Sequence, residues 1–487
     1  MSFDLVLFGG TGDLAWRKLM PALFQAFRHG TLPRDGRIIG IARDHLGDEE
    51  FRRLIEERFA RVELDKRPGP DEFGRFARML HYQRLDLSRP EDYGALKERL
   101  QQRNAATVVM YLATSPALFT TVCEQLAAAG LNTPATRIVL EKPLGHDLAS
   151  NRAINDTVRH VFPEQQIFRI DHYLGKPSVQ NLFALRFGNA LFEPLWRRET
   201  IANIQLTIAE DLGVEKRGAF YDSTGALRDM VQNHALQLVC ALAMEPPISS
   251  DADAIRDEKL KVLRSLRPWT SEAIGQHAIR GQYGSGSVRG EPVRAYRDEH
   301  GVAPDSTTET FVALRAEIAN WRWAGVPFYI RTGKRLAARD AHIVVNFRPA
   351  PHAIFRAPLG AANRLVINLQ PRDGLELHLL AQGQQQGRPL QTQPLVPVHL
   401  NLDFDQRFGS QRVGAYERLL LDVIDGRLNL FVRSDEQEAA WRWVEPLLEA
   451  WAPGNEAGLR TYAAGSWGPS AASAMIARDG FCWSEEQ

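Results

Sequence analysis

The sequence predicts two domains: an α/β domain with a doubly wound parallel sheet over residues 1–176, and a larger α+β domain on a mostly antiparallel sheet over residues 177–487. Before residue 176, short apolar runs alternate with helical patterns, as in parallel sheets covered on both faces. After it, strand-like runs alternate apolar and polar side chains with period 2. A length of 487 residues also favours more than one domain.

The first expected strand covers residues 3–8 and runs directly into a glycine-rich turn, residues 9–14, and then a helical pattern. This is the context of a Rossmann dinucleotide fingerprint, because positions without side chains let the backbone approach a pyrophosphate at the helix N-terminus. The turn reads Gly-x-x-Gly-Asp-Leu and so departs from GxGxxG. A purely structural turn is the alternative to cofactor binding.

A second strand, expected over residues 37–42, ends in Arg43. Dinucleotide sites that select NAD usually carry an acidic residue here for the ribose hydroxyl, whereas an arginine can pair with a 2′-phosphate. We therefore predict NADP, with NAD as a second choice. The alternative is a surface arginine that ends a strand, and the neighbouring Asp44 weakens the contrast with NAD.

Further parallel strands are expected over residues 79–85, 107–112 and 136–140, with helices around residues 90–103 and 116–129. The carboxyl ends of such strands face one crevice, where ligands of open α/β sheets bind. The third strand is followed by Asp86, and the fifth by Glu141-Lys142-Pro143. We predict that Lys142 points into this crevice, and the alternative is a solvated lysine.

Several ionisable side chains lie close together in the stretch Phe168-Arg-Ile-Asp-His-Tyr-Leu-Gly-Lys-Pro177. A short strand over 166–170 leads to Asp171, His172, Tyr173 and Lys176, and Pro177 then opens a helix. A helix N-terminus binds anions, so a phosphate held there by His172 and Lys176 is expected. The alternative is a polar loop whose aspartate only caps the helix.

The second domain should contain strands near residues 203–208, 308–318, 342–347, 364–369 and 375–380. We expect the first of these to be half-buried, helices to cover one face of the sheet, and residues 370–374, with their Asp-Gly signal, to form a hairpin connection. The glutamine-rich stretch 382–393 is expected to be an exposed loop.

Residues 222–240 form the clearest helix in the sequence, and His234 lies on its apolar stripe. A histidine so placed is either a hydrogen-bonded core residue or, if it faces a crevice with a carboxylate such as Asp171, a general base. Pattern alone would describe the remaining charged positions as solvated. These positions are Glu210, Asp229, Lys334 and Arg339.

Composition narrows the choice of partners. Lys plus Arg and Asp plus Glu both number 59, so no overall field recruits nucleic acid or a membrane, and we expect neither as a partner. The three cysteines, at 123, 240 and 482, form no CxxC pair, which argues against disulfides and thiolate metal sites. We expect a cytoplasmic protein that binds a small molecule and no metal.

Five motifs together resemble the glucose-6-phosphate dehydrogenase family. They are Gly-x-x-Gly-Asp-Leu-Ala at 9–15, Glu-Lys-Pro at 141–143, Arg-Ile-Asp-His-Tyr-Leu-Gly-Lys at 169–176, Arg-Asp-Met-Val-Gln-Asn-His at 228–234 and Arg-Thr-Gly-Lys at 331–334. The resemblance continues through Phe-Val-Arg-Ser-Asp-Glu at 431–436 and Gly-Ser-Trp-Gly-Pro at 465–469. It therefore covers essentially the whole chain.

The resemblance implies oxidation of glucose 6-phosphate at C1 to 6-phospho-D-glucono-1,5-lactone with hydride transfer to NADP+, the first step of the oxidative pentose phosphate pathway. It also implies a homodimer or homotetramer. His234 would be the general base and Asp171 the carboxylate that orients it. Substrate contacts are implied for His172, Tyr173, Lys176, Lys142, Glu210, Asp229, Lys334 and Arg339. Cofactor contacts are implied for Gly9, Gly10, Thr11, Gly12, Asp13, Leu14, Lys18, Arg43, Asp86 and Lys142.

One departure from the family concerns the cofactor, since Trp16 and Arg17 stand where many members carry Lys or Arg. Two rival functions remain at this point. The first is another Rossmann-fold sugar oxidoreductase in which Lys142 is the acid-base residue, which would have no need for His172 and Lys176. The second is a catalytically silent dinucleotide-binding regulator, which is disfavoured because His234 and Asp171 are both present.

Overall fold

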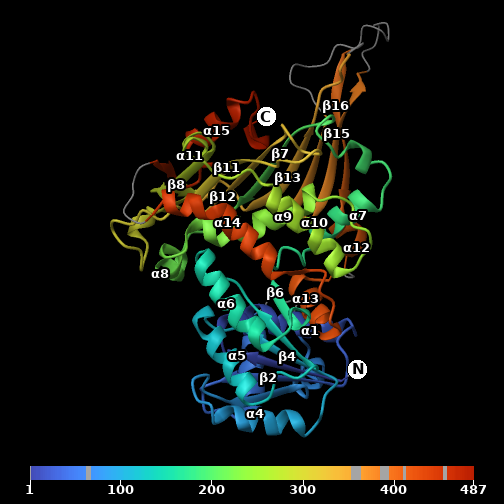
Figure 1. The fold of residues 1–487 in the computed structure, drawn as a ribbon, viewed down its shortest axis with the longest axis vertical. Helices are drawn as coiled ribbons and strands as arrows, with labels where there is room; N and C mark the ends of the chain where they lie inside the picture. The colour runs from blue at the N-terminus through green and yellow to red at the C-terminus, as the bar shows by residue number, and fades with distance from the viewer. Residues whose placement is uncertain are drawn as a thin grey trace. The chain divides into compact units, whose positions relative to one another are not determined.

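The computed structural model describes residues 2–61, 67–352, 363–383, 394–409, 413–452 and 458–486 (Figure 1). The chain forms two compact units. The first comprises residues 1–175 together with 247–256 and 413–438, and the second comprises 176–246, 257–412 and 439–487. Two later segments thus belong to the first unit, which no sequence pattern indicated. Most of the glutamine-rich stretch 382–393 lies outside the described residues.

The first unit contains a seven-stranded sheet of order β17-β6-β5-β4-β1-β2-β3. Strands β1 to β6 are all parallel, in the order 3-2-1-4-5-6 of a doubly wound Rossmann sheet, which confirms the predicted fold class. The short β17 pairs antiparallel with β6. The bounds are β1 Phe3–Phe8, β2 Gly36–Ala42, β3 Leu80–Arg84, β4 Thr107–Leu112, β5 Thr136–Leu140, β6 Ile167–Ile170 and β17 Phe431–Val432.

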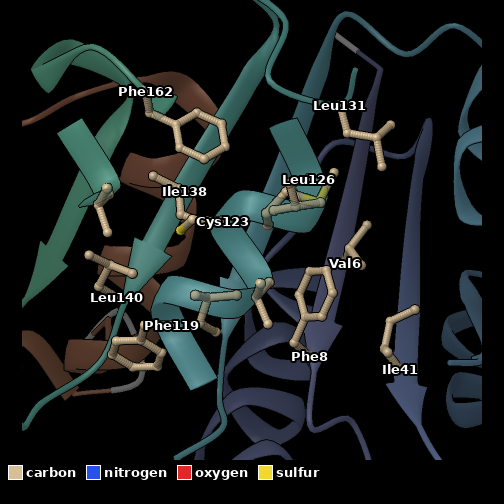
Figure 2. Close-up of a cluster of buried hydrophobic side chains, with 14 of the residues drawn as sticks. Val6, Phe8, Ile41, Phe119, Cys123, Leu126, Leu131, Ile138, Leu140 and Phe162 are labelled. Atoms are coloured by element: carbon tan, nitrogen blue, oxygen red, sulfur yellow. The ribbon is translucent and has the colours of Figure 1, made fainter. Parts of the chain in front are cut away.

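One face of this sheet packs against helices α4, α5 and α6 through a continuous apolar core (Figure 2). Val6, Phe8, Ile138 and Leu140 project from the strands, and Cys123 and its neighbours project from α5. The helices of this unit are η1 Ala15–Leu19 (a π-helix), α1 Met20–Arg28, α2 Asp48–Phe59, α3 Pro70–Ala77, α4 Asp92–Gln101, η3 Pro116–Leu118, α5 Phe119–Ala128, α6 Leu148–Val161, η4 Glu164–Gln166 and α13 Ala415–Asp425.

Helix α13 reaches the first unit from far along the chain and is held at both ends. Arg137 on β5 donates hydrogen bonds to the carbonyls of Val423 and Ile424 in its last turn. Near its start, a Cβ on Gly175 would lie only 2.8 Å from the carbonyl oxygen of Ala415. Glycine at 175 therefore lets this helix approach the turn that follows β6.

The second unit contains a nine-stranded sheet of order β16-β15-β14-β13-β7-β12-β11-β8-β18. It is mostly antiparallel, as predicted, but the pairs β7–β12 and β8–β18 are parallel. The β14–β15 pair confirms the predicted hairpin. The bounds are β7 Ile201–Ala209, β8 Ala278–Gly284, β11 Phe311–Glu317, β12 Pro327–Gly333, β13 Asp340–Phe347, β14 Arg364–Gln370, β15 Gly374–Gln382, β16 Leu395–Asp403 and β18 Leu459–Ala463, with β9 Gly286–Val288 and β10 Glu291–Val293 in a separate pair.

Strand β7 is buried on both faces, so the prediction of a half-buried strand was wrong. The alternate polar residues Asn203, Gln205 and Thr207 are each at most 1% exposed. The C-terminal segment covers Gln205, which donates to the carbonyl of Cys482 at 3.0 Å and accepts from the backbone N–H of Ser484 at 3.1 Å. Asn203 and Thr207 accept hydrogen bonds from the side chains of Asn346 and Arg331 on neighbouring strands. Period-2 alternation therefore indicates which side chains of the strand share a face, but it does not show that the polar face is exposed. In β7 the polar side chains form hydrogen bonds within the protein instead of with water.

The predicted helix over 222–240 is also corrected in part. Asp222 ends the short helix α8, and a turn separates it from η7, a π-helix, which continues into α9. The remaining helices are α7 Pro177–Phe187, η5 Glu193–Leu195, η6 Glu215–Arg217, α8 Gly218–Asp222, η7 Leu227–Ala235, α9 Leu236–Ala243, α10 Ala252–Ser265, α11 Ser271–His277, η8 Tyr296–Asp298, α12 Phe404–Phe408, α14 Ser434–Ala450, α15 Ser470–Ala477 and η11 Ser484–Glu486.

All three cysteines are free, as the sequence predicts. Among the described residues, no helix has both the length and the apolar character that a bilayer span requires.

Candidate functional site

In the first unit, the candidate residues follow the carboxyl ends of the parallel strands. The glycine turn follows β1, and Gly9 has a φ of +89°. A Cβ on Gly9 would lie 2.6 Å from the Ala113 carbonyl oxygen, and one on Gly10 would lie 2.6 Å from the Gly40 Cα. Both of these N–H groups donate to the carbonyl of Ile41. Glycine at positions 9 and 10 therefore lets the turn pack closely against the neighbouring strand ends, and a helix begins directly after the turn. The N-terminus of a helix favours anion binding.

The residues expected around the ribose lie at the ends of β2 and β3. Arg43 is exposed, and Asp44 accepts a hydrogen bond from the Thr11 hydroxyl at 3.1 Å. The pKa of Asp86 is lowered, chiefly by hydrogen bonds from the side chain and backbone of Ser88, with a smaller contribution from Arg43. Asp44 is thus engaged with the glycine turn, and Arg43 and Asp44 are both exposed after the end of β2.

The first helix carries the other expected cofactor residues. Lys18 is exposed on η1, and Asp13 forms an exposed ion pair with Arg17 at 2.9 Å. The Trp16 ring, which departs from the family pattern, packs under the guanidinium of Arg58. A tight glycine turn with exposed cations at Lys18 and Arg43 fits an anionic dinucleotide.

Glu141, at the end of β5, is a buried carboxyl group that accepts a hydrogen bond from the hydroxyl of Tyr111 on β4 at 2.5 Å. Burial raises the pKa of Glu141 to about 7, against the opposing effects of this hydrogen bond and of the adjacent Lys142. Glu141 is 7% exposed, whereas Lys142 is partly exposed at the same strand end.

The turn after β6 presents Asp171 and His172. Asp171 is 3% exposed, and its carboxylate accepts the backbone N–H of Tyr173 at 2.9 Å, which closes the turn. The partly exposed His172 ring stacks on the ring of Tyr416, with centroids 5.9 Å apart and an interplanar angle of 13°. Lys176 opens the second unit as the N-cap residue of α7.

In the second unit, the parallel pairing of β7 with β12 brings Glu210 and Lys334 together. Glu210 directly follows β7 and Lys334 directly follows β12. The last residues of the two strands, Ala209 and Gly333, are paired with each other. The Lys334 Nζ lies 2.6 Å from Glu210 Oε2 and 4.9 Å from the centroid of the Tyr221 ring. Arg339 is exposed and directly precedes β13, whose first residue pairs with Ala209 at the same edge.

His234 and Asp229 both lie on the π-helix η7. In an α-helix, residues five apart would point about 140° away from each other, at about 100° per residue. A π-turn closes i→i+5 hydrogen bonds, which brings residues five apart toward one face, and such turns occur frequently at functional sites. His234 is 1% exposed and the apolar stripe on which the sequence prediction placed it is buried, whereas Arg228, Asp229 and Asn233 of the same helix are partly exposed.

A buried carboxylate holds the start of η7. Glu309 accepts the backbone N–H of Leu227 at 3.0 Å, and burial raises its pKa. Asp222 in turn accepts hydrogen bonds from Tyr296 and Ser306, which fixes the loop before β11 against α8. The helix that carries His234 and Asp229 is therefore anchored at its N-terminus.

Four residues that support these side chains were not predicted from the sequence. Glu141 stood inside a recognised motif, yet only its neighbour Lys142 received a role. Tyr111, Tyr221 and Tyr416 carry no local signal, because their importance depends on strand neighbours or on a helix more than 200 residues away.

These two halves define a class of protein: a Rossmann dinucleotide-binding domain combined with a domain on a large, mostly antiparallel sheet. The profile "Glucose-6-phosphate dehydrogenase, NAD binding domain" matches residues 6–181, and "Glucose-6-phosphate dehydrogenase, C-terminal domain" matches residues 183–484. The chain belongs to the glucose-6-phosphate dehydrogenase family, which confirms the resemblance.

Individual relatives match along nearly their whole length. The glucose-6-phosphate 1-dehydrogenases of Rhizobium meliloti and Mycolicibacterium smegmatis are each 48% identical over 99% of this chain, and cover 98% and 97% of their own lengths. A solved glucose-6-phosphate dehydrogenase, in complex with its substrate glucose 6-phosphate, superposes with a TM-score of 0.90 at 33% identity, with 99% of this chain and 98% of that one covered. The enzyme from Mycobacterium avium gives a TM-score of 0.83 at 37% identity, with 99% of each chain covered.

The raised pKa of Glu141 predicts a pH-dependent contribution to stability. Its ordinary value is 4.5, so between pH 4.5 and about 7 the folded protein keeps a proton that the unfolded chain releases. Stability should therefore fall as pH rises through this window. Glu141→Gln is neutral throughout and should remove the fall, so that the urea midpoint of the variant gains on that of the wild type between pH 5 and pH 8.

Glu124→Gln, at an exposed position of α5, is the matched control and should follow the wild type. Parallel pH profiles for wild type and Glu141→Gln would contradict the prediction.

Proposed function

We propose that this protein oxidises glucose 6-phosphate at C1 to 6-phospho-D-glucono-1,5-lactone, with transfer of the hydride to NADP+, as the first step of the oxidative pentose phosphate pathway. The observation that carries the proposal is the match to glucose-6-phosphate 1-dehydrogenases over 99% of the chain. The solved relative named as a complex with its substrate glucose 6-phosphate supports the choice of substrate.

His234 is the proposed general base. A hydride leaves C1 only as the C1 hydroxyl loses its proton, so a base must reach that oxygen. Asp171 is proposed to orient the imidazole and to stabilise its protonated form. Two features support this assignment: His234 is a buried histidine on η7, and Asp171 is a buried carboxylate at the end of a parallel strand.

The substrate phosphate is proposed to bind His172, Tyr173 and Lys176. Lys176 is the N-cap residue of α7, a helix of 11 residues, and an N-terminus of this kind favours an anion through its N–H groups and its dipole. The sugar hydroxyls are proposed to contact Lys142, Glu210, Asp229, Lys334 and Arg339. The ion pair between Lys334 and Glu210 supports this, because it holds both side chains in position before a ligand arrives.

The cofactor is proposed to be NADP+, with NAD+ as a second choice. When bound, it would supply the hydride acceptor. The glycine turn would receive its pyrophosphate, and Arg43 would pair with the 2′-phosphate that distinguishes NADP+. The full proposed set is Gly9, Gly10, Thr11, Gly12, Asp13, Leu14, Lys18, Arg43, Asp86 and Lys142.

We further propose that the protein acts as a homodimer or homotetramer in the cytoplasm. Strand β16 lies at the end of the nine-stranded sheet and exposes Val396, Val398, Leu400 and Leu402 at alternate positions. Such an apolar row on an edge strand favours burial against a second copy. The three free cysteines are compatible with a reducing compartment.

Replacement of the proposed base tests the mechanism. His234→Asn should lower kcat by about 10²- to 10⁴-fold, the usual range for losing a general base, while the KM for glucose 6-phosphate stays close to that of the wild type. Absorbance at 340 nm follows the reaction. His300→Asn, at an exposed histidine of the same unit, is the control. An unchanged kcat in His234→Asn would refute the role.

Removal of a phosphate contact tests the substrate. Lys176→Ala should lower kcat/KM for glucose 6-phosphate by about tenfold or more, since hydrogen bonds to charged groups contribute about 1.5–3 kcal/mol. The slow turnover of free glucose and the KM for the cofactor should change little. Lys261→Ala, at an exposed lysine, serves as the control. Equal losses for phosphorylated and free glucose would contradict a phosphate contact.

The cofactor preference is tested at Arg43. Arg43→Ala should raise the KM for NADP+ by about tenfold and change that for NAD+ by less than about twofold, because only NADP+ carries the 2′-phosphate. Arg53→Ala, an exposed arginine on α2, controls for the loss of surface charge. Parallel changes with both cofactors would show that Arg43 does not read the 2′-phosphate.

The assembly is tested at the exposed β16 row. Leu400 is 62% exposed, and Leu400→Lys should weaken subunit association by at least about tenfold, because it places a charge in an apolar interface. Light scattering coupled to size exclusion would measure the mass. Ile248→Lys, at a position 96% exposed elsewhere, should leave the mass unchanged. A monomeric wild-type protein would refute the proposal.

A further inference from the structure

Glu309 and Thr310 are consecutive residues of the second unit that contact two segments of the candidate site. They lie directly before strand β11 and are 6% and 0% exposed. Glu309 contacts the start of η7, the helix that carries Asp229 and His234, and Thr310 contacts Lys334. Neither Glu309 nor Thr310 has a role in the proposed chemistry.

Glu309 binds the start of η7 at two points. Its carboxylate accepts the N–H of Leu227, the first residue of η7, at 3.0 Å, and its backbone carbonyl accepts the N–H of Ala226, also at 3.0 Å. The first N–H groups of a helix have no partner within that helix, so their acceptors have to come from elsewhere. Here one residue, 82 positions beyond Leu227, supplies both acceptors.

The carboxylate reaches this N–H because a glycine lies two residues before Leu227. Gly225 has a φ of +74°, and a Cβ on it would lie 2.3 Å from Glu309 Oε1. Any other residue would strain the backbone here and would displace the carboxylate. The close fit therefore leaves the Glu309 side chain little room to move away from η7.

Thr310 and Tyr462 fix the backbone of Lys334 on both sides. The Thr310 carbonyl accepts the N–H of Lys334 at 2.9 Å. The Tyr462 hydroxyl lies 3.0 Å from the Thr310 hydroxyl and donates to the carbonyl of Lys334 at 2.6 Å. Because residues 309 and 310 are joined by one peptide unit, with Cα atoms about 3.8 Å apart, the start of η7 is held close to Lys334 and its ion-pair partner Glu210.

We propose that Glu309 is a positioning residue, which holds the start of η7 so that the His234 imidazole keeps the position from which it accepts the proton of the C1 hydroxyl. The inference rests on the proposed function, because it requires His234 to be the general base. A shift of η7 would move His234 relative to Lys334 and Glu210, which are proposed to hold the sugar. A misplacement of about 1 Å can cost about 10²-fold in rate.

The test separates the acceptor oxygen of Glu309 from the size of its side chain. Glu309→Gln keeps an oxygen acceptor, Glu309→Met has a similar length without one, and Glu309→Asp keeps the carboxylate but is one methylene too short for Leu227. Glu436→Met is the matched control, because Glu436 is also buried and accepts a backbone N–H, that of Arg433, at 3.0 Å. Melting temperatures show which variants are folded, and Glu309→Asp decides the question if Glu309→Met is not.

The expected readout is a loss of kcat that follows the acceptor. Glu309→Met should lower kcat by about 10- to 100-fold and Glu309→Asp by at least about fivefold, whereas Glu309→Gln and the control should stay within about threefold of the wild type. The KM for the cofactor should change by less than about twofold in every variant, because the proposed cofactor contacts lie in the first unit.

A purely structural role gives a different result. It would lower the melting temperature of Glu309→Met and leave the kcat of the folded protein unchanged. That outcome, or a Glu309→Gln variant as slow as Glu309→Met, would overturn the positioning role.

The His234→Asn background separates this inference from the proposed function. There, Glu309→Met should lower kcat by less than about threefold further, since both changes affect the same step. If His234→Asn lowers kcat but the Glu309 variants do not, or if the two effects multiply fully, only the positioning role is overturned. If His234→Asn itself leaves kcat unchanged, His234 is not the general base and the positioning role fails with it.

Discussion

The parallel pairing of neighbouring strands is the constraint on which the rest of this structure depends. Parallel strands end at a common edge, so residues that follow them along the chain are collected in space. In the first unit, this places the glycine turn, Arg43, Glu141 and Asp171 at one edge of a six-stranded parallel array. In the second unit, the parallel pair β7–β12 does the same for Glu210 and Lys334 within an otherwise mostly antiparallel sheet.

Buried carboxylates then support the groups placed at these edges. Glu141 receives the hydroxyl of Tyr111, and Glu309 receives the first backbone N–H of η7. Burial raises the pKa of both, against their hydrogen bonds, because removal from water penalises the charged form. Each unit therefore keeps a buried acid next to its candidate residues, and hydrogen bonds to the carboxyl group offset part of the cost of its burial.

Sequence reasoning located the strands and most candidate residues, but it misjudged their surroundings. It identified β7 from its alternation and expected water on the polar face, whereas Gln205 is hydrogen-bonded to the C-terminal segment more than 270 residues away. It placed His234 on an apolar stripe, which is buried as expected, but it expected an α-helix where the structure has the π-helix η7. The burial of the polar face of β7 could not be predicted from the strand itself, because it depends on a segment elsewhere in the chain.

By itself, the sequence determined the local features: which strand each candidate residue follows, the glycine turn and the helix starts. It also indicated the family. Those features depend on backbone geometry and hydrophobic period, which a few consecutive residues specify. Tertiary structure alone decided that α13 returns to the first unit, that Tyr416 stacks on His172 and that Glu141 is buried. Such long-range contacts arise when distant apolar surfaces are removed from water together, and no short stretch of chain records which partner it will meet.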